Sequence, residues 1–510
     1  MLLMNKITTT TDEIFETRYI SYEKEKQAEL QSWKENNVYK EVPYTNQKCI
    51  SVRWVCSTKE SDDGQIKRKA RLVARGFEEE NINEIQKESP TCSKDTLRVM
   101  ASVIVQNEWK LNSIDIKTAF LQGDTINRKV FVKPPSGASC TENCVWELKK
   151  PVYGLSDASL KWYKRVLSFI LSSGGKVSIL DPALFLWHKD EKLIGIIALH
   201  VDDFICAGTK EFEESIIRKL RCTFVVGKEQ SISFRYLGLN VQHLGDQIVL
   251  HQHDYLEALK PLSLSAERRK LQDQPVTDKE KEAVRAKIGQ LLWVSTQTCP
   301  DICFDVSNLA TNLNSCTVKD IIRINKIILK LKEKPLNLRF QPIRYPKLIV
   351  YTDASFGNLL DGGSQGGYLV FMAGEDGICN LVSWQSKRLK RVVRSTLTAE
   401  TLAMMDGIDA GLFIASLYSE IVHGRIIDGN IPIEVITDNN SLIDALNSSK
   451  PVTDKRLRID ISALKESIQH HSINCQWVPG DLQLSDCLTK QGASSLKLTT
   501  TMETGKLPTY

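Results

Sequence analysis

Two sets of acidic residues have the types and positions that metal-dependent phosphoryl chemistry requires. In the first set, Asp115 lies inside a predicted strand, and Asp202 and Asp203 lie between two apolar segments. Isolated ionised carboxylates resist burial, so such residues are expected to be exposed, paired or bound to metal. Converging carboxylates suit a pair of Mg²⁺ ions, which can stabilise both the attacking and the leaving oxygen of a phosphoryl displacement. The competing explanation is an ordinary turn, where adjacent aspartates often occur.

The second acidic set lies towards the C-terminus. Asp353 and Asp438 each lie at the end of a predicted strand, Glu400 lies early in a predicted helix, and Asp486 follows near the C-terminus. These four residues can converge on one edge of a sheet, where they would suit a Mg²⁺ pair that activates water for phosphodiester hydrolysis. Taken singly, each acid is better explained as a cap or a surface residue, and Asp438 could be a helix N-cap.

The surrounding sequence predicts the elements that must position these acids. Residues 193–201 form a continuous apolar segment rich in β-branched residues, typical of a strand buried on both faces, and an apolar segment resumes after Asp203. Asp202 and Asp203 are therefore predicted at a hairpin tip. Residues 52–75 predict a second hairpin with its turn at residues 61–64. After residue 346, three strands, a long helix, a strand and a further helix predict a separate α/β domain.

Length and composition exclude several classes of protein. The chain has 510 residues, of which 42% are hydrophobic and 25% charged, so a small module and a mainly disordered, collagenous or membrane-spanning chain are excluded. We find no signal peptide or transmembrane segment. The 13 cysteines lack the paired spacing of a zinc site, which predicts reduced thiols in an intracellular protein. The net charge of +5 is too small to indicate a polyanionic partner by itself, and the basic clusters at 67–75 and 387–394 could be solvated faces.

The ordered neighbours of the first acidic set resemble the reverse transcriptase of copia-type retrotransposons. Six segments are similar to that family's blocks in order and spacing: KARLVARGF (69–77), DIKTAFLQGD (115–124), VFVKPPSG (130–137), VYGLSDASLKWY (152–163), LHVDDFICAG (199–208) and YLGLNV (236–241). The resemblance implies that Asp115, Asp202 and Asp203 are the metal ligands and catalytic residues of a nucleotidyltransferase.

The resemblance also implies a site for the incoming nucleotide. Phe120 matches the aromatic residue that packs under the sugar, where its ring would clash with a 2′-hydroxyl and favour deoxynucleotides, although it could instead be a core residue. Lys69, Arg71 and Arg75 are candidates to bind the triphosphate as charge-assisted donors, and any of the three could reach it.

Two further positions concern the primer and a departure from the family. Tyr236 and Gly238 lie where the family holds the primer end. Asp157 stands where the family commonly has a neutral amide, and Ser159 where it commonly has proline. We therefore expect Asp157 to lie near the nucleotide, where its negative charge could repel the triphosphate.

The second acidic set resembles the ribonuclease H domain that follows the polymerase in the same elements. The similar segments are YTDASF (351–356), SWQSKR (383–388), STLTAE (395–400), ITDNNS (436–441), KRLRID (455–460) and LSDCLTK (484–490). The resemblance implies that Asp353, Glu400, Asp438 and Asp486 are its metal ligands. The basic residues just before Glu400 then become candidates to contact the phosphates of an RNA–DNA hybrid; they are Lys387, Arg388 and Arg391.

The predicted architecture is an α+β polymerase with palm, fingers and thumb around an antiparallel palm sheet, followed by an α/β ribonuclease H-like domain with a mixed sheet. The predicted divisions are a partly disordered leader (1–32), fingers and palm (33–261), a linker with a helical thumb or connection (262–345), the ribonuclease H-like domain (346–490) and a flexible tail (491–510).

The predicted function is an RNA-directed DNA polymerase with ribonuclease H endonuclease activity, using two Mg²⁺ ions per site, or Mn²⁺. Its expected partners are an RNA template, a DNA primer, dNTPs and an RNA–DNA hybrid, in a cytoplasmic virus-like particle or the nucleus. The sequence shows no nucleocapsid, protease or integrase motif, so we interpret it as a polyprotein fragment or a genomic remnant. The alternative function is a catalytically impaired remnant that only binds nucleic acid.

Overall fold

The computed structural model describes residues 22–60 and 66–508. The chain divides into two compact units, the first made of Met1–Ser89 and Thr118–Val166 and the second of Pro90–Lys117 and Leu167–Tyr510. Residues 1–21 of the predicted leader and the turn predicted at residues 61–64 lie outside the described residues. The palm strands group with the C-terminal domain in this division, whereas the predicted domain limits place them with the fingers.

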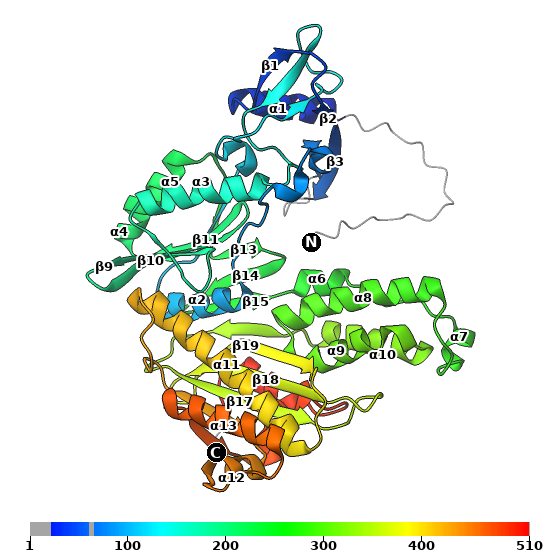
Figure 1. Ribbon diagram of the computed structural model, residues 1–510, viewed down its shortest axis with the longest axis vertical. Coiled ribbons are helices and arrows are strands. Elements are labelled where there is room, and N and C mark those ends of the chain that lie inside the picture. The colour runs from blue at the N-terminus through cyan, green and yellow to red at the C-terminus, as the bar shows by residue number, and fades with distance from the viewer. Residues whose placement is uncertain (1–21, 61–65, 509–510) are drawn as a thin grey trace. The chain divides into compact units, whose positions relative to one another are not determined.

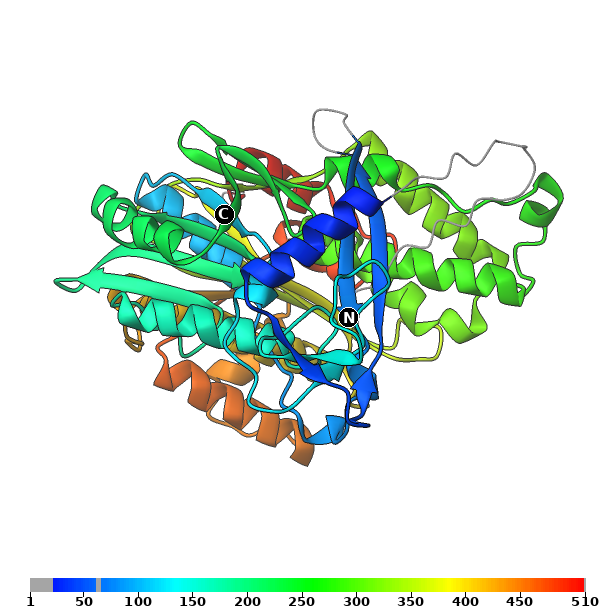
Figure 2. The same ribbon diagram turned by 90° about the horizontal axis from the view of Figure 1, so that it is seen from above.

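The first unit combines a helix, a two-stranded ribbon and a small sheet. Strands β3 (Val52–Glu60) and β4 (Ile66–Ala74) pair antiparallel along their whole length, as the predicted hairpin requires. Helix α1 (Glu23–Glu35), dark blue in Figure 2, lies across this ribbon. The sheet has the order β1-β7-β6-β2, with strands β1 (Tyr39–Pro43), β2 (Cys49–Ile50), β6 (Phe131–Val132) and β7 (Cys144–Leu148). Buried Trp33, Leu72 and Trp146 form the core between these elements.

The palm is a six-stranded sheet of the second unit. All its pairings are antiparallel in the order β12-β5-β11-β10-β9-β8, which confirms the predicted palm sheet. The strands are β5 (Asn112–Ile116), β8 (Lys176–Val177), β9 (Leu184–Lys189), β10 (Lys192–His200), β11 (Asp203–Gly208) and β12 (Val226–Ser231). The accompanying helices are α2 (Lys94–Gln106), α3 (Ala158–Ser172), in which the boundary between the units falls, α4 (Lys210–Phe212) and α5 (Arg218–Thr223). The apolar segment of β10 is buried, as its composition predicts.

A second antiparallel sheet and a helical segment follow the palm. The sheet has the order β13-β14-β15-β16, with strands β13 (Ser233–Tyr236), β14 (Leu239–Leu244), β15 (Gln247–His251) and β16 (Asn337–Phe340). The helices are α6 (His253–Ala258), α7 (Ala266–Lys270), α8 (Asp278–Gln297), α9 (Cys303–Thr311) and α10 (Val318–Glu333). Thr277 caps the start of α8 with a capping box to Glu280, and Pro300 lies between α8 and α9.

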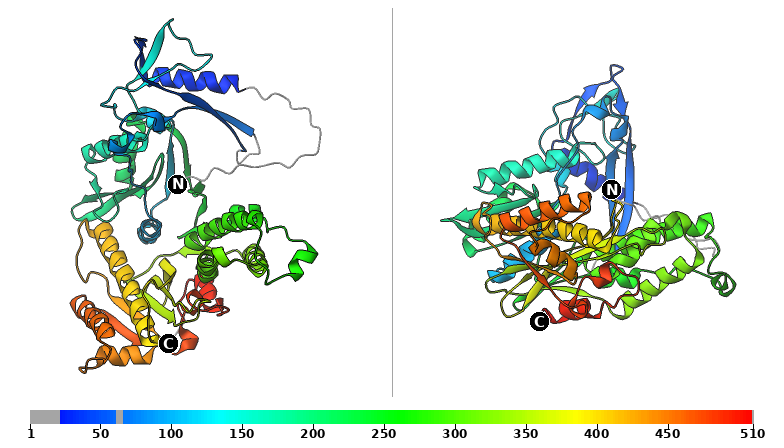
Figure 3. Two further views of the ribbon diagram at one scale, coloured as in Figure 1. Left: turned by 45° about the vertical axis from the view of Figure 1, so that its right-hand side comes forward. Right: turned by 60° about the horizontal axis from the view of Figure 1, so that its bottom comes forward.

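The C-terminal domain is built on a mixed sheet with the order β19-β18-β17-β20-β21. The first three strands pair antiparallel and the last two join in parallel. They are β17 (Lys347–Ser355), β18 (Gln365–Ala373), β19 (Cys379–Arg388), β20 (Ile433–Thr437) and β21 (Asn474–Trp477). Helix α11 (Thr396–His423) runs along this sheet in Figure 1, and Figure 3 shows α12 (Asn440–Asn447) and α13 (Lys455–His470) in orange beside it.

Two features of this domain differ from the sequence analysis. The segment predicted as a flexible tail forms helix α14 (Leu496–Thr504), whose buried Leu498 and Met502 are four residues apart and face the domain. A run of threonines, which are poor helix formers, hides this helical spacing in the sequence.

Helix α11 is long and apolar enough to cross a membrane by length and composition alone. It packs against β17, β18, β20 and α13, as a core helix of a folded domain does.

Arg98 of helix α2 joins three elements of the second unit. Its guanidinium donates to the backbone carbonyls of Thr296 (2.7 Å) and Gln297 (3.2 Å) at the C-terminus of α8, and its Cζ lies 3.7 Å from the ring centroid of Trp384 on β19. The Trp384 indole in turn donates to the Ser295 carbonyl at 2.9 Å. A buried cation therefore caps the carbonyl end of α8 and ties the palm to the C-terminal sheet.

We expect Arg98→Met to lower the stability of the second unit by about 3 kcal/mol, because the helix carbonyls that Arg98 satisfies would be left buried without donors. Calorimetric unfolding of the full chain measures this change. Exposed Arg235 of β13 supplies the matched control, Arg235→Met, which should have little effect. An Arg98→Met protein as stable as this control would contradict the structural role.

Candidate active sites

The first acidic set lies on two neighbouring palm strands. Asp203, the first residue of β11, pairs directly with Asp115 of β5. Asp202 lies with Val201 in the two-residue turn between β10 and β11, where Val201 has a positive φ of 57°. The Ile116 N–H donates to the Asp202 carbonyl at 3.0 Å, which fixes the turn against β5. The predicted hairpin tip is therefore confirmed, and the fold brings the three half-buried acids to one edge of the palm.

Gly227 leaves the space that the Asp115 carboxylate occupies. A Cβ at this glycine would lie 2.4 Å from Asp115 Oδ2, a clash that only a glycine avoids. Gly227 lies in β12 between Val226 and Glu229, where the pairing with β5 is irregular. Sequence reasoning missed Gly227, although a glycine inside a strand is a known signal of close approach by another group. A carboxylate held against this glycine, beside two further carboxylates, is a donor set that fits a divalent cation.

Two predicted nucleotide-binding residues of the first unit contact a common ring. The Arg71 guanidinium lies 5.0 Å from the ring centroid of Tyr153, and the Phe120 and Tyr153 ring centroids are 5.1 Å apart. Phe120 is half-buried against the core. Lys69 is exposed on β4, and Arg75, also exposed, lies 3.7 Å from Glu78. The structure thus brings Arg71 and Phe120 together, while Lys69 and Arg75 lie elsewhere on the ribbon and just after it.

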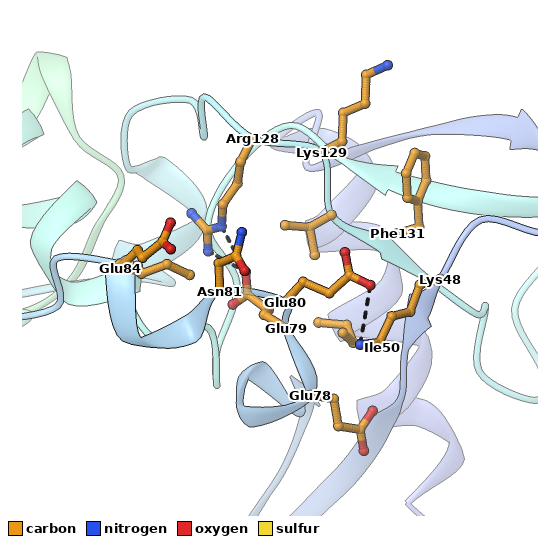
Figure 4. Close-up of a pocket in the computed structure, with 12 residues that line it drawn as sticks. Lys48, Ile50, Glu78, Glu79, Glu80, Asn81, Glu84, Arg128, Lys129 and Phe131 are labelled. Atoms are coloured by element: carbon orange, nitrogen blue, oxygen red, sulfur yellow. Dashed lines mark hydrogen bonds and ion pairs between the residues drawn. The ribbon is translucent and has the colours of Figure 1, made fainter.

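Asp157 does not carry the free negative charge that the sequence suggested. Its carboxylate is buried and accepts two hydrogen bonds from Arg128, at 2.6 and 2.9 Å, and Arg128 also donates to Glu79 at 2.8 Å. Figure 4 shows Arg128 and Glu79 at the wall of a cavity of about 380 Å³. Asp157 is therefore held by a guanidinium inside the first unit, and its effect on a triphosphate stays a prediction.

The same unit contains a close approach of two glycines that the sequence analysis did not find. A Cβ on Gly76 would lie 2.4 Å from the Gly154 carbonyl oxygen, and a Cβ on Gly154 would lie 2.0 Å from the Ala74 carbonyl oxygen. Gly154 also has a positive φ of 93°. These glycines let the segment around Tyr153 pack directly against the end of β4, which carries Arg71.

The two predicted primer-binding residues differ in exposure. The Tyr236 side chain is 2% exposed, so it does not present a surface to nucleic acid, and its hydroxyl has no hydrogen-bond partner among the described residues. It packs beside Met100 and Leu250 in an apolar core. Gly238 has a positive φ of 79°, and a Cβ there would lie 3.5 Å from the Trp293 ring. Only Gly238 remains a candidate for backbone contact with a primer.

The second acidic set converges in the C-terminal domain. One oxygen from each of Asp353, Asp438 and Asp486 lies within 4.8 Å of the others. Among the described residues, the three palm acids do not form so compact a group. Asp353 is fully buried on β17, Asp438 follows β20, and Asp486 begins a 3₁₀ turn. Strand ends and a turn therefore meet at one sheet edge, as their positions in the sequence predict.

Burial raises the pKa values of Glu400, Asp353 and Asp438. It raises the pKa of Glu400 to about 9 and that of Asp353 to about 7, and neighbouring carboxylates contribute to both shifts. Burial also raises the pKa of Asp438. Glu400 Oε2 is buried without a hydrogen-bond partner among the described residues. An orphaned carboxylate oxygen beside three gathered carboxylates is the donor set that a divalent cation fits.

The predicted hybrid-binding cations all form ion pairs. Lys387 pairs with Asp406 at 2.9 Å, Arg391 forms a two-point contact with Asp460, and Arg388 pairs with Asp361. Each cation keeps more than a third of its side chain exposed. Their role in binding hybrid phosphates stays a prediction. A phosphate would have to compete with the paired acid for each cation.

Comparison with known proteins covers the part of the chain that contains the palm acids. Residues 36–266, which include the palm acids, match the protein family described as reverse transcriptase (RNA-dependent DNA polymerase). This part of the chain is similar to the reverse transcriptase family. That family implies a divalent metal, in agreement with the acids gathered around the palm hairpin.

The reverse transcriptase region and the domain after it are both covered by curated relatives. The retrovirus-related Pol polyprotein from transposon RE1 of Arabidopsis thaliana is 26% identical over 467 residues, covering 86% of this chain and 30% of the relative. The Pol polyprotein from transposon TNT 1-94 of Nicotiana tabacum is 26% identical over 501 residues, covering 91% and 36%. The predicted resemblance to copia-type Pol polyproteins is confirmed. The chain spans about a third of the length of these relatives.

A solved structure supports the fold of most of the chain. The foamy viral protease-reverse transcriptase dRH, solved in complex with double-stranded DNA, has a TM-score of 0.50 and 13% identity, and the match covers 89% of this chain and 69% of that chain. At this identity the likeness shows the fold alone. LC11-RNase H1, solved in complex with an RNA/DNA hybrid, matches 28% of this chain and 94% of that chain with a TM-score of 0.23. The predicted fold class, a reverse transcriptase followed by a ribonuclease H-like domain with a mixed sheet, is confirmed.

The raised pKa values make the metal-free ribonuclease H-like domain sensitive to pH. The folded state keeps a proton on Glu400 up to about pH 9, whereas the unfolded state releases it near 4.5. The folded state therefore binds more protons over this interval, and its free energy of unfolding should fall as pH rises through it. We expect the melting temperature in EDTA to fall between pH 5 and pH 9, and to fall less in Glu400→Gln. A melting temperature that rises over this interval would contradict the burial of the acids.

Proposed function

We propose that the chain is an RNA-directed DNA polymerase with an attached ribonuclease H, which copies RNA into DNA and hydrolyses the RNA strand of the resulting hybrid. The observation that carries this proposal is the presence of two separate carboxylate clusters, one at the palm hairpin and one at the edge of the mixed sheet. Its proposed partners are an RNA template, a DNA primer, dNTPs and an RNA–DNA hybrid. The solved relatives named above were bound to double-stranded DNA and to an RNA/DNA hybrid, which supports this choice.

In the proposed mechanism each cluster would hold Mg²⁺. Asp115, Asp202 and Asp203 would be the ligands in the palm. The second set of ligands would be Asp353, Glu400, Asp438 and Asp486. Bound divalent ions would activate the primer hydroxyl at one site and water at the other, and would stabilise the leaving oxygen at both.

The chain's own residues would orient the substrates. The Arg71 guanidinium, held over the Tyr153 ring, offers fixed charge-assisted donors for a triphosphate. The Phe120 ring, packed on Tyr153, would exclude a 2′-hydroxyl and so favour dNTPs. In the palm, the short turn at Asp202 and the close contact of Asp115 with Gly227 restrict the ligand carboxylates before substrate binds.

The alternative, a remnant that only binds nucleic acid, rests on the negative charge of Asp157. The pairing of Asp157 with Arg128 weakens this argument, because the carboxylate has a cationic partner. All seven proposed metal ligands are present in the sequence, which favours the enzyme.

A primer-extension assay tests the proposal directly. A labelled DNA primer on an RNA template should be extended by the purified chain with dNTPs and Mg²⁺, and the RNA of the product should be cleaved. EDTA should stop both reactions, and ribonucleotides should not replace dNTPs. Binding of the primer–template without extension or cleavage would instead support the remnant.

A further inference from the structure

A lysine ammonium group lies inside the carboxylate cluster of the ribonuclease H-like domain. Lys490 Nζ is 2.5 Å from Asp486 Oδ1 and 3.3 Å from Asp353 Oδ1. Both acids belong to the group whose oxygens lie within 4.8 Å of one another. A positive charge therefore lies where a divalent cation would need the same carboxylate oxygens.

The backbone around Lys490 places it there. The N–H groups of Thr489 and Lys490 both donate to the Asp486 carbonyl at 3.1 Å, which closes the turn that begins at Asp486. The Thr489 hydroxyl donates to Asp353 Oδ2, the other oxygen of that carboxylate. Asp353 is thus held on one oxygen by a hydroxyl and on the other by the ammonium.

This arrangement differs from an ordinary surface ion pair. The side chain of Asp353 is 1% exposed, whereas that of Lys490 is 38% exposed, so the lysine can withdraw while the acid cannot. The two carboxylates that Lys490 contacts favour its charged form. A Mg²⁺ ion binds carboxylate oxygens at about 2.0–2.1 Å, and two ligands that hold an ammonium at contact distance cannot hold the ion in the same place.

We propose that Lys490 is a positioning residue that acts as a resident counter-ion: it occupies the Asp353 and Asp486 oxygens when metal is absent and must leave them when a divalent ion binds. This inference rests on the proposed ribonuclease H function. In the metal-free state Lys490 offsets the repulsion among the gathered carboxylates. Once displaced, its ammonium remains within one side-chain length of the site and is free to contact a phosphate of the hybrid.

The displacement couples metal binding to hybrid binding. Metal binding costs the protein its Lys490 contacts, and a hybrid phosphate restores a partner for the ammonium. By linkage, the hybrid should raise the affinity for metal, and metal should raise the affinity for the hybrid by the same factor. Removing the ammonium should therefore tighten metal binding without hybrid and weaken this coupling.

The test is a Mn²⁺ titration of the full chain without nucleic acid. Electron paramagnetic resonance measures the free Mn²⁺ at each step. Each protein carries Asp202→Asn to suppress binding in the palm, and Asp353→Asn identifies the signal from the second site. We expect Lys490→Met to bind Mn²⁺ at least fivefold more tightly than the parent. Its melting temperature should be lower in EDTA and equal to that of the parent at saturating Mn²⁺. Lys347 of β17, which pairs with Glu434 at 2.8 Å, supplies the control. Lys347→Met should leave Mn²⁺ affinity unchanged.

The outcomes separate the two proposals. Mn²⁺ affinity that is unchanged or weaker in Lys490→Met would overturn the counter-ion role, since a purely structural lysine would lower the melting temperature at every metal concentration. If Lys490→Met does not fold, Lys490→Gln is titrated in its place against the same criterion. Absence of Asp353-dependent Mn²⁺ binding in all variants would overturn both proposals. Tighter Mn²⁺ binding without hybrid cleavage would support the counter-ion role and contradict the proposed nuclease function.

Discussion

Asp202→Asn is expected to reduce primer extension on an RNA template by about 10³-fold or more while leaving cleavage of a preformed RNA–DNA hybrid unchanged. Asparagine keeps the size of the side chain but removes the charge that a metal ligand needs, and the loss of several kcal/mol of transition-state stabilisation corresponds to this factor. The turn itself should persist, because its hydrogen bond from Ile116 uses the Asp202 backbone carbonyl rather than the side chain.

The control for this prediction is Asp246→Asn, an exposed aspartate in the turn between β14 and β15, which should leave both activities unchanged. Extension rates should be measured with primer–template in excess, so that a change in binding is not read as a change in chemistry. Retention of full extension by Asp202→Asn would remove this residue from the catalytic set and with it the main support for the polymerase.

The elements that carry the palm acids could be predicted because local pattern and tertiary position agree there. The apolar strand before Asp202 is buried on both faces, so a charged pair directly after it can lie only where the strand ends. Asp353 and Asp438 follow the same logic, since β17 and β20 are parallel neighbours and end at the same sheet edge. In these places the hydrophobic pattern shows where each strand ends and therefore where the acid after it lies.

The features that sequence reasoning missed depend on contacts between distant residues. Arg128 and Asp157 are 29 residues apart, and neither pattern nor spacing indicates that they pair. The contact between Gly227 and Asp115 joins strands separated by over 100 residues. The burial of Tyr236 is also set by tertiary packing, because strand β13 places this ring on the core side rather than towards solvent. Charge and aromatic character therefore identify candidate binding residues. They do not show which of these side chains are already paired or buried inside the fold.

Asp353→Asn is expected to reduce hybrid cleavage by about 10³-fold or more while leaving primer extension unchanged. Asp353 is fully buried and accepts hydrogen bonds from Thr489 and Lys490, so an asparagine oxygen can keep one of these contacts while losing the charge. Asp444→Asn, at an exposed position of α12, is the matched control. Cleavage by Asp353→Asn at the rate of this control would contradict the metal-ligand role.

The same substitution, which is expected to reduce cleavage, should stabilise the metal-free protein. Burial raises the pKa of Asp353 to about 7, so ionising it at pH 8 opposes folding, whereas at pH 5 the group is already protonated in the folded state. Asparagine removes this ionisation, and Asp353→Asn should melt at a higher temperature than the parent at pH 8 in EDTA, with a smaller difference at pH 5.

An excess of Mg²⁺ should reverse the order at pH 8, because only the parent gains the stabilisation that a ligand bound to the folded state provides. A variant that melts lower than the parent in EDTA at pH 8 would show that the contacts to Thr489 and Lys490 outweigh the repulsion among the acids. The higher-melting outcome would mean that this carboxylate is retained for its chemistry at a cost in stability, as expected of an active site.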